Sequence, residues 1–142
     1  MRIRNQKGLT LLEVLLSLVI LTLILVTIMK FFPQMGTMNK QNEEKQQAVN
    51  LAKQELIEWQ KIDLKSFLAN PSASVLSEYG RFVDPYYIFT KTKDNYTVEV
   101  WLKNTSDLNN GLIKANMLLI KILNKNNNVI SETYGYYLYK EG

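Results

Sequence analysis

A long apolar run near the start of the chain constrains the fold more than any other feature. It extends from Leu9 to Met29, and Glu13 is its only charged residue. A helix of this length spans about 31 Å at ~1.5 Å per residue, which matches the ~30 Å hydrocarbon core of a bilayer. The sequence therefore predicts a membrane-spanning helix, and the rest of the 142-residue chain must be understood as something attached to it.

The excess positive charge of the chain lies before this run. The formal net charge is +4, and Arg2, Arg4 and Lys7 precede the apolar run without an accompanying acid. Without them, 14 basic residues face 13 acidic ones, so nothing in the overall charge favours nucleic acid as a partner. Basic residues beside a spanning helix favour the cytoplasmic side of the membrane. We therefore expect a cytoplasmic N-terminus, with the bulk of the chain on the outside.

Two ordinary interpretations of the apolar run compete. A secretory signal peptide has an apolar region of ~7–15 residues followed by a small-x-small cleavage site. This run is longer, and residues 29–33 (Met-Lys-Phe-Phe-Pro) offer no such site. An uncleaved single-pass anchor fits the hydropathy but leaves Glu13 unexplained. A carboxylate at the centre of a spanning helix costs ~2.5–3.5 kcal/mol and usually marks a function.

The residues around Glu13 form a pattern of their own. Gly8 is followed by Leu9, Thr10, two leucines and Glu13, and an unbroken apolar segment continues from there. Over roughly residues 4–30 this arrangement resembles the N-terminus of type IV pilins and pseudopilins, with Leu9 where that family most often has Phe. The resemblance implies cleavage between Gly8 and Leu9 by a membrane-embedded prepilin peptidase, followed by N-methylation of Leu9.

The resemblance also implies that Glu13, together with Thr10, serves filament assembly. Cleavage leaves a positive α-amine on Leu9, and in filaments of the family the Glu of one subunit neutralises the amine of its neighbour. In an apolar environment a charge pair costs far less than an isolated charge. Glu13 would then set the register between subunits. A simpler interpretation is an interfacial carboxylate stabilised by the positive end of the helix macrodipole.

The resemblance implies a structural subunit, a minor pilin or pseudopilin, rather than an enzyme. Its partners would be the prepilin peptidase, other pilin or pseudopilin subunits, the inner-membrane assembly platform and the membrane itself. The subunit would first lie in the cytoplasmic membrane and then in an extracellular or cell-surface filament of a pilus, secretion or competence system. The alternative from a different class is an uncleaved single-pass membrane protein whose extracytoplasmic domain binds a ligand or partner.

The helix is expected to continue beyond the membrane segment. Pro33 and Gly36 predict a bend or a local break, because Pro removes a helical hydrogen bond. Residues 37–66 lack Pro and Gly and are rich in good helix formers, so they predict helix again. Spacings of three and four residues there place an apolar stripe on one face, formed by Val49, Ala52, Leu56 and Trp59 with Ala48, Leu51 and Ile62 alongside.

The C-terminal half predicts strands. Segment 70–85 is punctuated by Pro, Gly and Ser and is expected to be a loop. Four strand-like runs follow at 86–92, 96–102, 115–123 and 129–139, separated by turns or loops at 93–95, 104–114 and 125–128. Apolar side chains alternate in the last three runs, at Val98, Val100 and Leu102, at Leu118, Ile120 and Ile122, and at Ile130, Tyr134, Tyr136 and Leu138. Gly135 suggests a bulge.

These elements define the expected fold class. Short turns favour an antiparallel meander, and its apolar face has to be buried against the helical stripe. We expect an α+β fold in which a long N-terminal helix, half membrane-spanning and half amphipathic, packs on a small C-terminal antiparallel β-sheet. The expected organisation is a cleaved leader at 1–8, a transmembrane and filament-core helix at 9–29, its continuation at 30–66, and a globular domain at 67–142.

No catalytic constellation is recognisable. The chain has no His and no Cys, which removes the commonest general base and all thiolate chemistry. We expect no enzyme activity, no cofactor and no metal site. Asp107 to Gly111 offers oxygen ligands but too few charges for a specific calcium site. Tyr and Lys residues mix in the C-terminal half and could stack on single-stranded nucleic acid, but ordinary amphipathic strands explain them because Tyr favours strands.

Overall fold

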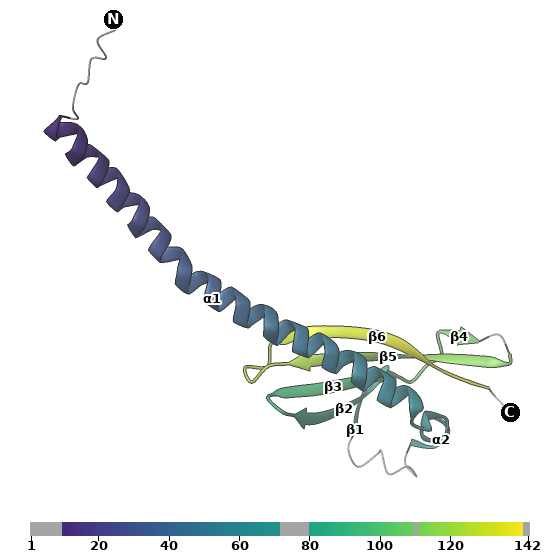
Figure 1. Cartoon of the computed structure of the whole chain (residues 1–142). Helices are drawn as coiled ribbons and strands as arrows, with labels where there is room; N and C mark the ends of the chain where they lie inside the picture. The colour runs from purple at the N-terminus through teal and green to yellow at the C-terminus, as the bar shows by residue number, and fades with distance from the viewer. Residues whose placement is uncertain (1–9, 72–79, 110, 141–142) are drawn as a thin grey trace, which may run out of the picture. The chain divides into compact units, whose positions relative to one another are not determined.

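The computed structural model describes residues 10–71, 80–109 and 111–140, which form two helices and six strands (Figure 1). The chain divides into two compact units, with the boundary after Asn42. Helix α1 (Leu11–Lys61) contributes to both units. Its N-terminal part belongs to the first, and its C-terminal part, helix α2 (Leu64–Ala69) and the sheet form the second.

The N-terminal part of α1 presents an apolar surface on every side. The large apolar side chains from Leu11 to Met29 are all exposed, and this stretch is long and apolar enough to cross a membrane by length and composition. Its three hydroxyl groups donate to backbone carbonyls of the preceding turn, from Ser17 to Val14, from Thr22 to Leu18 and from Thr27 to Leu23. The few polar groups are thus satisfied within the helix, as an apolar environment requires.

Pro33 lies inside α1, and the helix continues through it and through Gly36. The Oγ1 atom of Thr37 donates a hydrogen bond of 3.0 Å to the carbonyl oxygen of Pro33, one turn earlier in the same helix. The local break considered from the sequence is therefore not present. A bend at this position stays a prediction.

α1 ends at Lys61 rather than at residue 66, because Asp63 starts a new helix. The Oδ1 atom of Asp63 accepts hydrogen bonds from the backbone N–H groups of Lys65 and Ser66, and its Oδ2 atom accepts one of 2.7 Å from the Ser66 hydroxyl. Asp63 is therefore the N-cap of α2, and these contacts favour the start of a new helix over the continuation of α1. The short helix α2 then turns Leu64 and Phe67 into the core.

The six strands form one antiparallel sheet, in the order β1-β2-β3-β5-β4, with β6 on the other edge of β5. Four strands match the predicted runs closely: β2 (Tyr86–Lys93), β3 (Tyr96–Lys103), β5 (Ile113–Leu123) and β6 (Val129–Lys140). Two short strands lie where the sequence predicts loops, β1 (Gly80–Val83) and β4 (Leu108–Asn109). Both are edge additions with little apolar alternation, so periodicity could not reveal them.

Asp and Asn side chains explain the tight turns between the strands. Asp94 and Asn127 adopt left-handed backbone angles, with φ of 55° and 58°, which Asp and Asn tolerate better than most residues. In the turn between β5 and β6, the Oδ1 atom of Asn124 accepts hydrogen bonds from the backbone N–H groups of Asn126 and Asn128. The Asn-rich segment thus closes its own turn.

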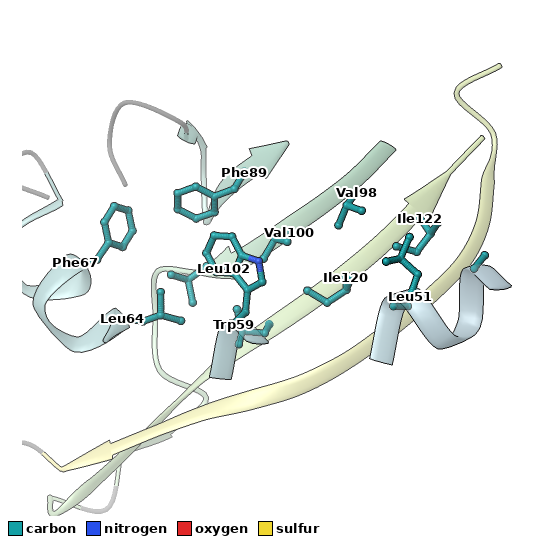
Figure 2. Packing of buried hydrophobic residues seen from close by; sticks show 13 residues of the cluster. Leu51, Trp59, Leu64, Phe67, Phe89, Val98, Val100, Leu102, Ile120 and Ile122 are labelled. Carbon is teal, nitrogen blue, oxygen red and sulfur yellow. The ribbon is translucent and has the colours of Figure 1, made fainter. Parts of the chain in front are cut away.

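The core of the second unit lies between α1 and one face of the sheet (Figure 2). Trp59 of α1 packs on Phe89 of β2 with ring centroids 4.8 Å apart, and Phe67 of α2 lies edge-on to Phe89. The predicted inward residues of β3 and β5 are all buried, namely Val98, Val100, Leu102, Leu118, Ile120 and Ile122. This arrangement confirms the predicted α+β fold, a long helix packed on an antiparallel sheet.

Gly135 marks a close approach of α1 rather than the bulge suggested by the sequence. It pairs in register with Leu118, and the irregularity between β5 and β6 lies at Ile122/Leu123 instead. A Cβ atom at position 135 would lie 3.1 Å from the Leu56 methyl groups and from Nε2 of Gln60. The missing side chain therefore lets α1 pack directly on β6.

The apolar alternation predicted for β6 exists, but most of it points away from α1. Tyr134, Tyr136 and Leu138 are 67%, 42% and 63% exposed, whereas Ile130 packs against the core. Ile130 lies at the bulge, where an extra residue reverses the faces of the strand that follows. The outer face of the sheet thus carries its own apolar row, which passes through Trp101, Leu119 and Tyr134.

Candidate processing and assembly site

The predicted processing residues, Gly8 and Leu9, lie outside the described residues. The predicted assembly residues, Thr10 and Glu13, lie at the start of α1, which begins at Leu11. The structure therefore describes the part of the candidate site that follows the predicted cleavage position.

Thr10 and Glu13 form a reciprocal pair of contacts at this helix start. The backbone N–H of Thr10 donates to Oε2 of Glu13 at 2.9 Å, and the Glu13 N–H donates to the Thr10 Oγ1 at 3.3 Å. The Thr10 hydroxyl also donates to Oε2 at 3.2 Å. This is a capping box, in which two orphan N–H groups of the first turn are satisfied at once. The Thr-x-x-Glu spacing could have revealed it from the sequence.

The capping box fixes where the only carboxylate of the apolar segment lies. Glu13 is in the first turn of α1, where the positive end of the helix macrodipole stabilises a negative charge. The hydrogen bonds given to its carboxylate by the described residues both end on Oε2. Among the described residues Oε1 therefore has no donor, and it can accept a hydrogen bond from a further cation. Around it the helix surface is formed by exposed apolar side chains, beginning with Leu11, Leu12 and Val14.

A second carboxylate, Glu55, is fully buried between α1 and the sheet, and the sequence did not indicate it. Lys91 Nζ lies 2.6 Å from its Oε2, and Lys93 Nζ lies 3.3 Å from its Oε1. Glu55 lies three residues after Ala52 and four before Trp59, so it occupies the apolar stripe itself. Its position within the apolar stripe is the feature of the sequence that could have indicated a buried charge. The ion pairs anchor α1 to β2.

The Tyr and Lys residues that suggested nucleic-acid stacking are divided between the two faces of the sheet. Lys91 and Lys93 neutralise Glu55 on the face that α1 covers. On the same face, the Tyr96 hydroxyl donates to the backbone carbonyl of Glu44, and burial raises the pKa of Tyr96. Tyr136, in contrast, lies on the opposite face. These residues therefore form no single basic and aromatic surface.

Asp107, the charged member of the calcium candidate, already has a basic partner. Its carboxylate forms an ion pair with Lys103 and accepts a hydrogen bond from the Lys103 ammonium, and this hydrogen bond raises the pKa of Lys103. Asn110, another member of that candidate, lies outside the described residues. Asp107 therefore serves to hold the start of the β3–β5 connection on β3.

Comparison with known proteins concerns the N-terminal segment. Residues 3–29 match the family model described as the prokaryotic N-terminal methylation motif. Neither the comparison with curated proteins nor the comparison with solved structures finds a match. The matched segment includes Gly8 and Leu9 and the Thr10–Glu13 capping box. The motif implies processing by a prepilin peptidase and assembly with other pilins. Residues 3–29 thus carry the N-terminal methylation motif, which is the cleavage signature of type IV prepilins.

Proposed function

We propose that this chain is a minor pilin or pseudopilin of a type IV pilus-like filament. The prepilin peptidase cuts between Gly8 and Leu9, Leu9 is N-methylated, and the mature subunit joins the filament through α1. Before assembly the subunit lies in the cytoplasmic membrane with its N-terminus on the cytoplasmic side. The filament belongs to a pilus, secretion or competence machine, and its partners are other pilins and the assembly platform.

One observation carries the proposal: Glu13 is the only charge on an otherwise apolar helix surface, and its carboxylate is held at the very start of that helix. Cleavage after Gly8 places the new α-amine one residue before Thr10, the other half of the capping box. The open Oε1 of Glu13 can then accept from the amine of a neighbouring subunit. Such a pair lowers the cost of both charges in an apolar filament core.

A second candidate function rests on a groove in the second unit. The groove has a volume of about 720 Å³ and lies between α1 and the turns that follow β2 and β5. Its walls include the side-chain amides of Asn50, Gln54, Asn95 and Asn126. A volume of this size suits a small polar ligand. A ligand bound in this groove would favour the alternative function, an uncleaved single-pass membrane protein whose extracytoplasmic domain binds a ligand or partner.

The N-terminus of the protein distinguishes the two functions. The full chain is expressed in cells with and without a prepilin peptidase, and its N-terminal residue is identified by mass spectrometry. The proposal expects loss of residues 1–8 and one methyl group on Leu9 only when the peptidase is present. An intact N-terminus in peptidase-positive cells would overturn it and favour the single-pass alternative.

A matched pair of variants tests the assembly role separately from processing. Glu13→Ala is expected to insert and to be cleaved normally but to be lost from filaments, because the α-amine then has no partner. The control is Glu43→Ala, which removes a carboxylate from the exposed polar part of α1 and should assemble normally. Filaments with unchanged amounts of the Glu13→Ala subunit would remove the proposed charge pairing.

A further inference from the structure

The strand β6 is a long edge of the sheet. Within the described part of the chain it pairs with β5 alone, although it extends from Val129 to Lys140. An unpaired edge exposes backbone N–H and C=O groups that can pair with another strand, and proteins usually blunt such edges with Pro or with short strands. β6 has 12 residues and no Pro. It is also rich in Tyr, which favours strands.

The outward side chains of β6 follow an order that is complementary to itself. From one end to the other, the outer face presents Glu132, Tyr134, Tyr136, Leu138 and Lys140, an acid at the start and a base at the end. If a second copy of this strand runs antiparallel with Tyr136 opposite Tyr136, then Glu132 faces Lys140 of the other copy at both ends. Tyr134 then faces Leu138. Opposite charges and aromatic–aliphatic pairs are the favourable cross-strand combinations.

We propose that two copies of the chain pair through β6, antiparallel about a two-fold axis at Tyr136, and so join their sheets into one. The interface is isologous, because the same strand serves both copies. Backbone hydrogen bonds supply the attraction, and the Glu132–Lys140 pairs select this register over a shifted one. The proposal needs neither cleavage after Gly8 nor filament assembly.

One contact at this edge would have to adapt. Gln60 of α1 donates a hydrogen bond of 3.1 Å from Nε2 to the carbonyl oxygen of Tyr136. A carbonyl oxygen can accept two hydrogen bonds, so the contact can be shared, or the exposed Gln60 side chain can turn away. The contact therefore weakens the pairing without preventing it.

Cysteine cross-linking tests the register directly, since the chain has no Cys of its own. The full-length protein is purified in detergent micelles and oxidised gently. In the proposed dimer Tyr136→Cys lies opposite itself at about 4.5–5.5 Å between Cα atoms, within reach of a disulfide. Tyr134→Cys lies about 14 Å from its own copy and should cross-link poorly alone. A mixture of Tyr134→Cys and Leu138→Cys chains should cross-link as efficiently as Tyr136→Cys.

The expected result is at least about tenfold more dimer for Tyr136→Cys than for Tyr134→Cys alone. Apolar N-terminal helices can also bring chains together in micelles, but such contacts do not depend on the position within β6. Equal cross-linking at positions 134 and 136, or a monomer by light scattering at all accessible concentrations, would overturn the proposal.

A charge exchange provides an independent readout on the protein without added Cys. Glu132→Lys and Lys140→Glu each place like charges opposite one another and should weaken the dimer roughly tenfold or more. The double variant restores the opposite charges in reversed order and should recover the dimer. Lys125→Glu, in the exposed turn before β6, is the control and should leave the dimer unchanged. Two single variants that dimerise like the parent would also overturn the proposal.

Discussion

The ammonium of Lys91 lies 2.6 Å from the carboxylate of Glu55, whose side chain is completely shielded from solvent. The two lysines that contact Glu55, Lys91 and Lys93, are themselves 44% and 39% exposed. The pairing is therefore asymmetric, because the carboxylate depends on its partners whereas each ammonium can still reach water.

This asymmetry predicts opposite outcomes for removing the two sides of the cluster. The double variant Lys91→Ala/Lys93→Ala leaves Glu55 buried without a partner and should lower the free energy of unfolding by about 3–5 kcal/mol. Glu55→Met removes the buried charge, fills its space and releases both lysines to water, so its cost should be about 1 kcal/mol or less. Chemical unfolding of the full chain in micelles, followed by tryptophan fluorescence, to which buried Trp59 contributes, measures both.

The control for these variants is Lys53→Ala, which removes an exposed lysine from α1 itself. It should change the free energy of unfolding by less than about 0.5 kcal/mol. If the lysine double variant were as stable as this control, the cluster would contribute nothing to the packing of α1 on β2.

A side chain at position 135 should destabilise the second unit. The Cβ atom of Gly135→Ala would lie 3.1 Å from Leu56 and Gln60, so α1 or β6 would have to shift by a few tenths of an ångström. We expect a loss of about 1–2 kcal/mol, measured by thermal unfolding. Thr133→Ala, on the same face and strand, is the comparison, and an equal or smaller loss for Gly135→Ala would argue against the close approach.

The cap of α2 should make stability depend on pH in the acid range. The hydrogen bond from the Ser66 hydroxyl is the main reason that the pKa of Asp63 lies below its ordinary value of 3.8. A lowered folded pKa means that Asp63 stabilises the fold above pH 3.8, and that this contribution disappears as the pH falls through the folded value. Asp63→Asn keeps a capping oxygen but cannot ionise, so its melting temperature should fall less on acidification than that of the parent. If the melting temperatures of the two proteins fell by the same amount on acidification, ionisation of Asp63 would not be the cause of the pH dependence.

The capping box predicts that Thr10 protects the first turn of α1. Thr10→Val keeps the shape of the side chain but removes the hydroxyl contacts with Glu13, whereas Thr10→Ser keeps them. Loss of a cap costs about 1 kcal/mol, so amide exchange at Glu13 and Val14, whose N–H groups donate to Thr10, should become about fivefold faster in Thr10→Val and stay unchanged in Thr10→Ser. Hydrogen exchange of the full chain in micelles measures this, and identical rates for Thr10→Val and the parent would exclude the box.

The sequence predicted the layers of the fold because hydrophobic periodicity decides them. The alternation at Val98, Val100 and Leu102 indicated which face of β3 is buried, and the apolar stripe of α1 supplied a surface to cover it. Periodicity failed where a single local contact decides the outcome. The bulge at Ile130 reversed the faces of β6, and Asp63 ended α1 through hydrogen bonds that no hydrophobic pattern records.

At the candidate site the sequence predicted chemistry better than geometry. Glu13 was identified because a charge within an apolar run is costly, whatever contacts it makes. The Thr10–Glu13 contacts are local and follow from the Thr-x-x-Glu spacing, whereas the partners of Glu55 come from a strand far away in the sequence. Pairs of the second kind are set by tertiary packing, so a pattern along the chain indicates at most that a charge lies in an apolar stripe.

The boundary between the two units lies inside α1, after Asn42, and not in a linker. A shortened soluble protein must therefore be cut within a helix, and the position of the cut decides whether the new end is stable. A start at Glu43 would place two carboxylates, Glu43 and Glu44, in the first turn, where the helix macrodipole favours them. The first buried residue, Ala48, follows one turn later. The chain thus offers a natural starting point for a water-soluble fragment that keeps every residue of its core.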